Sequence, residues 1–62
     1  MAADISVIIA MYNVERYIER AIESALQQRD VSVEVIVVDD GSTDRSLEIV
    51  RAMSDPRIQV HQ

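Results

Sequence analysis

The chain has 62 residues and a mass of 7.0 kDa, which allows one small domain and excludes an enzyme that needs two lobes. It has no cysteine, so disulfides and thiolate metal sites are excluded as reinforcement. Six arginines and no lysine stand against eleven acidic residues, for a net charge of -5. With no basic cluster along the chain, nucleic acid and anionic membrane surfaces are poor partners.

The first half of the chain predicts a strand followed by a helix. Residues 5–10 (ISVIIA) form a short β-branched run typical of a strand buried on both faces, and Asn13 then offers a helix N-cap. Residues 5–11 are too short an apolar run for a signal peptide or a membrane span. Apolar residues with the three-and-four spacing of one helix face follow over residues 14–26: Val14, Tyr17, Ile18, Ala21, Ile22, Ala25 and Leu26.

The second half repeats this pattern and adds a third strand. Residues 33–38 (VEVIVV) are nearly continuous in apolar β-branched residues, as expected for a central parallel strand. Ser42 or Thr43 can cap a second helix, which residues 54–56 (SDP) end. Residues 57–62 alternate polar and apolar, which favours an edge strand. The buried side of the second helix would use Leu47, Ile49, Val50 and Met53.

These elements predict an α/β fold with βαβαβ order: a Rossmann-like half-domain with a three-stranded parallel sheet in the order 3-2-1. Because crossovers between parallel strands are right-handed, both helices are expected on one face of the sheet. The other face is left bare, although its strands are apolar enough for burial on both faces. We therefore expect residues 1–62 to be a truncated part of a larger domain, or a half-domain that covers this face by forming a homodimer.

Ligands of open α/β sheets bind beyond the carboxyl ends of the strands. Two loops follow such ends in this chain, over residues 10–13 (AMYN) and residues 39–44 (DDGSTD). In a parallel sheet with adjacent strands, these loops lie side by side at the same edge. This edge is the predicted functional site.

Residues 6–13 (SVIIAMYN) and residues 35–44 (VIVVDDGSTD) resemble the opening of family 2 glycosyltransferases, and the resemblance covers essentially the whole chain. It implies the N-terminal, nucleotide-sugar-binding segment of a glycosyltransferase A fold. It also implies that Tyr12 lies against the base of the donor and that Asp40 accepts a hydrogen bond from its N–H edge. Where the family usually has proline, this chain has Ala10, which loosens the loop without removing a contact made by backbone.

The residue types fit these assignments on physical grounds. An ionised Asp40 only accepts hydrogen bonds, so it would bind the N3–H of uracil or the N1–H and N2–H of guanine and disfavour cytosine. Tyr12 is the only aromatic residue predicted on a loop at this edge, where it could stack on a base, whereas Tyr17 falls on the apolar stripe of the helix. A UDP-sugar is therefore the expected donor, with a GDP-sugar second.

Each candidate residue has a plainer alternative. Tyr12 could be a surface aromatic, Asp40 a turn residue and Asn13 a helix cap, while Glu15 could be a surface charge or part of the site. Gly41 supplies a positive φ angle or allows close approach of a ligand. Two further residues are expected to take no part in the chemistry. Asp39 would hold its loop through backbone N–H groups or face a helix N-terminus, and His61 is isolated on an edge strand.

The chain has no Asp-x-Asp, and three aspartates near the site would repel a diphosphate. The resemblance implies an inverting sugar transfer to a hydroxyl in cell-envelope polysaccharide synthesis, with Mg²⁺ or Mn²⁺ and the catalytic base held beyond residue 62. No catalytic or metal-binding residue is expected in this segment. The resemblance implies a cytoplasmic location, with any membrane association through the missing part.

Two other functions compete with this one. The first is a non-catalytic nucleotide-binding or assembly module that dimerises through the bare sheet face. The second is a phosphotransfer loop over residues 39–43 (DDGST), which is weak because haloacid-dehalogenase-type phosphatases have one residue between their two carboxylates.

Overall fold

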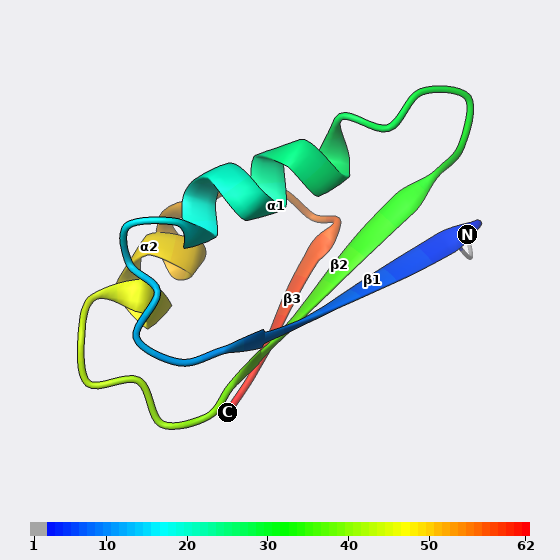
Figure 1. Cartoon of the computed structure of the whole chain (residues 1–62). Helices are drawn as coiled ribbons and strands as arrows, with labels where there is room; N and C mark the ends of the chain where they lie inside the picture. The colour runs from blue at the N-terminus through cyan, green and yellow to red at the C-terminus, as the bar shows by residue number, and fades with distance from the viewer. Residues whose placement is uncertain (1–2) are drawn as a thin grey trace.

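The computed structural model describes residues 3–62 and has the predicted βαβαβ order. All three strands are parallel, and the sheet order β1-β2-β3 confirms the predicted central position of β2 (Figure 1). The sheet and the two helices that connect its strands are β1 (Ile5–Met11), α1 (Ile18–Leu26), β2 (Val33–Asp39), α2 (Ser46–Ala52) and β3 (Ile58–His61).

Both helices cover the same face of the sheet, as the handedness of the crossovers predicts (Figure 1). The strands alternate accordingly: along β2, Val33, Val35 and Val37 are buried, while the residues between them are half-buried or exposed. The β1 and β2 strands pair in register from Ile5 with Val33 to Met11 with Asp39. This register brings the carboxyl ends of the two strands to one level.

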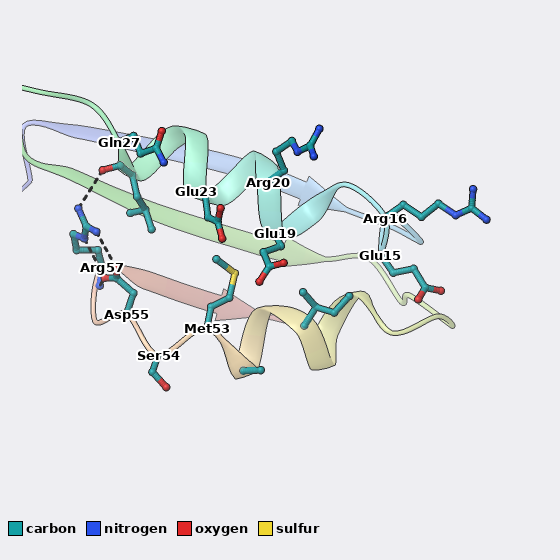
Figure 2. Close-up of a pocket in the computed structure, with 13 residues that line it drawn as sticks. Glu15, Arg16, Glu19, Arg20, Glu23, Gln27, Met53, Ser54, Asp55 and Arg57 are labelled. Atoms are coloured by element: carbon teal, nitrogen blue, oxygen red, sulfur yellow. Dashed lines mark hydrogen bonds and ion pairs between the residues drawn. The ribbon is translucent and has the colours of Figure 1, made fainter.

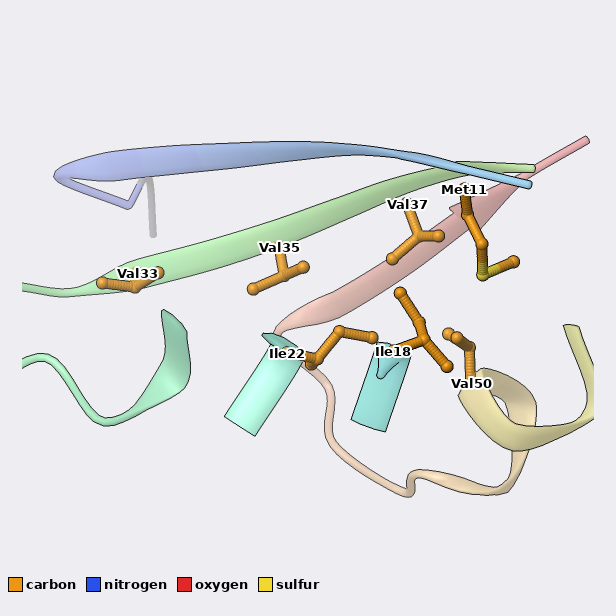
Figure 3. Packing of buried hydrophobic residues seen from close by; sticks show 7 residues of the cluster. All are labelled: Met11, Ile18, Ile22, Val33, Val35, Val37 and Val50. Atoms are coloured by element: carbon orange, nitrogen blue, oxygen red, sulfur yellow. The ribbon is translucent and has the colours of Figure 1, made fainter. Parts of the chain in front are cut away.

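The hydrophobic core fills the space between the sheet and the two helices (Figure 3). Val35 and Val37 of β2 are fully buried. On α1, Ile18 and Ile22 lie on one side of the helix and are almost completely buried. Each such side chain stabilises the fold by about 1.5 to 3 kcal/mol relative to an exposed position. The core comprises Met11, Ile18, Ile22, Val33, Val35, Val37 and Val50.

The first helix begins later than the sequence predicts, at Ile18 and not at Val14, because residues 15–17 form a turn. The stripe centres on Ile18 and Ile22, and Tyr17 precedes Ile18 by about 100° around the helix axis. The side chain of Tyr17 is consequently 69% exposed, so the prediction that it belongs to the apolar stripe is wrong. Ala21 is exposed for the same reason.

The second helix follows Arg45, so neither Ser42 nor Thr43 is its N-cap, and that prediction is wrong as well. Their side chains instead form hydrogen bonds to Asn13 in the other loop. The predicted buried side is confirmed: Val50 is buried, and the remaining members pack against the core as half-buried residues, namely Leu47, Ile49 and Met53.

The second face of the sheet is open, as predicted. Ile8 at the centre of β1 is 70% exposed, and Val38 of β2 is 41% exposed. At one end of this face the Ser6 hydroxyl donates a hydrogen bond to Glu34 Oε1 at 2.9 Å. The helices present in residues 3–62 are all too short, and not apolar enough, to cross a membrane.

Candidate functional site

The loops after β1 and β2 meet at the carboxyl edge of the sheet (Figure 1). The strands extend slightly further than predicted, to Met11 and Asp39, and the Asp40 N–H donates to the Met11 carbonyl at 2.9 Å. Tyr12 and Asp40 therefore directly follow paired residues of neighbouring strands. The structure brings the two predicted base-binding residues to the same edge of the sheet.

Both of these residues have side chains open to solvent. Tyr12 is 56% exposed, and Asp40 is exposed as well; the two residues follow Met11 and Asp39, the last pair in register. Among the described residues, the hydrogen bonds and ion pairs that shape this edge leave the Asp40 carboxylate without a partner. An exposed acceptor and an exposed ring at adjacent positions are available to a ligand.

Asp39 has the structural role that the sequence predicts. It is only 8% exposed, and its Oδ1 accepts a hydrogen bond from the Ser42 N–H at 3.1 Å, which closes the loop after β2. Gly41 lies within this loop at φ +79°, and a Cβ there would meet nothing within 4 Å. Its backbone conformation, and not lack of space, therefore requires glycine.

Asn13 joins the two loops. Its Oδ1 accepts hydrogen bonds from the N–H groups of Thr43 at 2.8 Å and Asp44 at 3.2 Å, and its Nδ2 donates to Thr43 Oγ1 at 3.3 Å. The residue has φ +50°, in the left-handed region that asparagine tolerates better than most residues. The N-cap prediction for Asn13 is wrong, because α1 begins five residues later and no side chain caps it.

The β2–α2 loop and the first residue of α2 accept hydrogen bonds from three backbone N–H groups in the segment that leads into α1. These groups precede the helix, so they have no partner within it and need one from elsewhere. The three bonds are Asn13 N–H to Ser42 Oγ at 3.1 Å, Val14 N–H to Ser46 Oγ at 2.9 Å, and Glu15 N–H to Asp44 Oδ2 at 3.2 Å. In each bond the two partners are 29 to 32 residues apart in the sequence. A search for capping residues near the helix therefore does not find Asp44 and Ser46 as acceptors of these N–H groups.

Asp44 and Ser46 support each other at this junction. Desolvation raises the pKa of Asp44, but hydrogen bonds from the hydroxyl and N–H of Ser46, and from the Glu15 N–H, outweigh it and lower this pKa below its ordinary value. Ser46 is completely buried, and its N–H donates to Asp44 Oδ1 at 2.9 Å. The junction therefore favours a charged Asp44.

The other predicted site residues lie around this edge. Ala10 is exposed in β1, where it pairs with Val38, and it precedes the loop. Glu15 contributes its N–H to the loop junction, while its side chain lines a groove on the helical side of the molecule. His61 ends β3 as an exposed residue paired with Val38.

The groove has a volume of about 760 Å³ and lies between α1 and α2 (Figure 2). In Figure 2, Glu19 and Glu23 of α1 point toward the side of the groove where Met53 lies, at the end of α2. Neither Tyr12 nor Asp40 lines the groove. At the far end, Arg57 binds the Asp55 carboxylate at 2.7 Å and donates to the Leu26 carbonyl at 3.3 Å. Arg57 thus links the loop before β3 to the end of α1.

A divalent cation would require several carboxylate or imidazole ligands close together. Within residues 3–62, no group of three or more histidine, cysteine, aspartate or glutamate residues is placed to hold a metal ion. The aspartates at the sheet edge do not converge, because Asp39 closes its own loop and Asp44 binds the entrance of α1. The residues that the structure describes therefore do not form a metal centre.

The family model described as glycosyl transferase family 2 matches residues 6–61, which include both loops at the sheet edge. The chain belongs to glycosyltransferase family 2. Similar curated proteins include the succinoglycan biosynthesis protein ExoO of Rhizobium meliloti, which is 49% identical over 92% of this chain. Others are the glycosyltransferase EpsJ of Bacillus subtilis, 49% identical over 94% of the chain, and a hyaluronan synthase of Pasteurella multocida, 40% identical over 90%.

This chain spans only a small part of these relatives. It covers 16% of the length of ExoO, 18% of EpsJ and 6% of the hyaluronan synthase. The match establishes the family of this chain over residues 6–61.

Proposed function

We propose that this chain is the donor-binding segment of an inverting glycosyltransferase and that it binds the nucleobase of a UDP-sugar. The observation that carries the proposal is the placement of Tyr12 and Asp40 directly after the paired ends of β1 and β2, both exposed. In open α/β sheets this edge is where nucleotides bind.

The two side chains would divide the recognition between them. The ring of Tyr12 would stack on the base, an interaction worth about 1 to 3 kcal/mol that tolerates any base. Asp40 would accept the uracil N3–H in a charge-assisted hydrogen bond worth about 1.5 to 3 kcal/mol. Cytosine has an unprotonated ring nitrogen at this position, so it would face the carboxylate without a hydrogen to donate. A GDP-sugar is the second candidate, because guanine also offers N–H groups on this edge.

The chemical step would use groups outside this chain. In an inverting transfer, the acceptor oxygen forms a bond to the anomeric carbon, the bond to the nucleoside diphosphate breaks, and a general base takes the proton of the hydroxyl. A divalent cation would supply charge stabilisation for the departing diphosphate, and Mg²⁺ or Mn²⁺ is expected. The part of the chain described by the structure has no cluster to hold it, so we place its ligands elsewhere in the protein.

The names of the relatives support a polysaccharide as the product. ExoO is named for succinoglycan biosynthesis, and the Pasteurella protein is named as a hyaluronan synthase. We propose that the sugar is added to a growing cell-envelope polysaccharide at the cytoplasmic side, where nucleotide sugars are available. Any membrane association would then reside in other parts of the protein.

Calorimetric titration of the chain with UDP and with CDP, both in the presence of Mg²⁺, tests the base-binding role. We expect tighter binding of UDP. Asp40→Asn should weaken UDP binding about tenfold while leaving CDP binding unchanged or improved, since an amide can donate to cytosine. Tyr12→Leu should weaken both nucleotides by about fivefold or more, because stacking is not selective.

The matched control is Asp30→Asn, which removes the same charge from an exposed position in the α1–β2 loop, before β2 begins. This variant corrects for the general repulsion between an acidic chain and an anionic nucleotide. Equal affinity of the unaltered chain for UDP and CDP, or equal effects of Asp40→Asn and Asp30→Asn, would refute the assignment of Asp40.

A second candidate function is assembly through the open face of the sheet. The exposure of Ile8 and Val38 favours coverage of this face by other polypeptide, and a homodimer is one way to provide it. The molecular mass of the chain in solution, measured without nucleotide, tests this function.

A further inference from the structure

Asn13, whose side chain binds the opposite loop, directly follows Tyr12, the proposed base-stacking residue. We infer that Asn13 is a positioning residue that holds Tyr12 at a defined distance from Asp40, and that it thereby sets the base preference of the site. This inference rests on the proposed nucleotide-binding function. The proposed role of Asn13 involves no contact with the base, which would be bound by Tyr12 and Asp40.

Tyr12 is held from both sides. On its N-terminal side, the Met11 carbonyl accepts the Asp40 N–H at 2.9 Å. On its C-terminal side, the Asn13 amide group binds the backbone of Thr43 and Asp44 at 2.8 and 3.2 Å. These two attachments fix the chain before and after Tyr12 to the same loop that contains Asp40.

The loop with Asp40 needs this second attachment. Gly41 follows Asp40 directly with φ +79°, a conformation that glycine adopts without strain, and it has no side chain of its own with which to hold the loop. Asp39 closes the loop through its hydrogen bond with Ser42, but this bond lies within the loop and does not connect it to the segment that contains Tyr12. Beyond the end of strand pairing, the contacts of Asn13 with Ser42, Thr43 and Asp44 are the cross-loop contacts nearest to Tyr12 in sequence. The bonds from Val14 to Ser46 and from Glu15 to Asp44 follow further along the chain.

Asparagine meets two requirements at this position. It adopts φ +50° more readily than most residues, and it offers both an acceptor and a donor to the opposite loop. Glycine would satisfy only the first requirement. A substitution to glycine therefore removes the side-chain bonds to Thr43 and Asp44 without straining the backbone, and it keeps the backbone N–H that binds Ser42.

Loss of this attachment should affect base preference more than stacking. Stacking tolerates sliding of the base over the ring, whereas a hydrogen bond weakens steeply once the heavy atoms separate beyond about 3.2 Å or lose alignment. The ratio of UDP to CDP affinity is the informative quantity. Partial unfolding lowers both apparent affinities by the same factor and leaves their ratio unchanged.

The test compares Asn13→Gly with Asp30→Gly by titration with UDP and with CDP. Asp30 is the matched control because it also has a positive φ, +65°, and lies in the α1–β2 loop outside the site. We expect Asn13→Gly to reduce the UDP preference about fivefold or more and Asp30→Gly to leave it unchanged. Asn13→Asp, which keeps the acceptor oxygen, should retain most of the preference even if its charge weakens both nucleotides.

Hydrogen exchange of the Thr43 N–H shows whether the attachment has opened. Faster exchange in Asn13→Gly together with an unchanged UDP preference would overturn the inference and leave the proposed function standing. If the unaltered chain itself shows no preference for UDP, the proposed function and this inference both fail. Should Asn13→Gly not fold, loss of the preference in a folded Asn13→Asp would also count against the inference.

Discussion

Replacing Ser46 by alanine is expected to destabilise the fold by removing the link between the second loop and the first helix. Ser46 is completely buried, and its Oγ accepts the Val14 N–H at 2.9 Å. The substitution leaves that half-buried N–H without a partner, which costs about 1 to 3 kcal/mol. The higher helix propensity of alanine offsets up to about 0.5 kcal/mol. The expected net loss is about 1 to 2 kcal/mol, against a total of about 3 to 9 kcal/mol for a chain of this length.

Urea unfolding followed by circular dichroism measures this loss. With an m-value of about 1 kcal/mol per M for so small a chain, the midpoint should fall by about 1 to 2 M. Ser54→Ala makes the same chemical change at an exposed loop position and should leave the midpoint unchanged. Because the Ser46 hydroxyl helps to lower the pKa of Asp44, the substitution should also raise this pKa in an NMR titration.

Equal midpoints for Ser46→Ala and Ser54→Ala would contradict this expectation. The Val14 N–H would then have found another partner, and the bond to Ser46 would not stabilise the segment before α1. An unchanged pKa of Asp44 would separately contradict the hydrogen bond from the Ser46 hydroxyl to this carboxylate.

The remaining predictions concern acid stability and the open face. Arg57 lowers the pKa of Asp55 from 3.8 to about 2, chiefly through side-chain hydrogen bonds, so the stability this pair provides is present above pH 3.8 and is lost as the pH falls towards 2. Asp55→Asn should therefore lose less stability than the unaltered chain between pH 5 and pH 2 in urea unfolding, and an equal loss would contradict this. If the open face drives self-association, Ile8→Glu should restore the monomer mass in analytical ultracentrifugation. Tyr17→Glu is the control, because Tyr17 is 69% exposed and Ile8 70% exposed, and it should leave the self-association unchanged. Equal effects of the two substitutions would contradict association through the open face of the sheet.

The sequence predicts the strands well because their pattern reflects burial directly. The β-branched run of β2, with Val35 and Val37 at its centre, belongs in the middle of a parallel sheet whatever surrounds it. The handedness of crossovers then places both helices on one face and leaves Ile8 and Val38 open to solvent. The two loops after the strand ends follow from the same topology, so Tyr12 and Asp40 could be placed at one edge in advance.

The helix starts could not be predicted in the same way. Asn13 and Thr43 are residue types that cap helices locally, but in the structure they bind each other across the two loops. The competition between a local cap and a partner 30 residues away depends on how closely the loops approach, which strand register decides. Tyr17 shows a different limitation: the buried side of α1 centres on Ile18 and Ile22, so Tyr17, about 100° away around the helix axis, lies outside it.

The sequence by itself determined the order of elements, the parallel sheet, the bare face and the edge at which a ligand would bind, because these follow from apolar periodicity and chain handedness. Only the tertiary structure decided how that edge is held together. The N–H groups of Val14 and Glu15, which lead into α1, are bound by Ser46 of α2 and by Asp44 of the β2–α2 loop, and N–H groups of that loop are bound by Asn13. A backbone N–H ahead of a helix takes whichever acceptor folding brings within reach, and sequence distance carries no information about it.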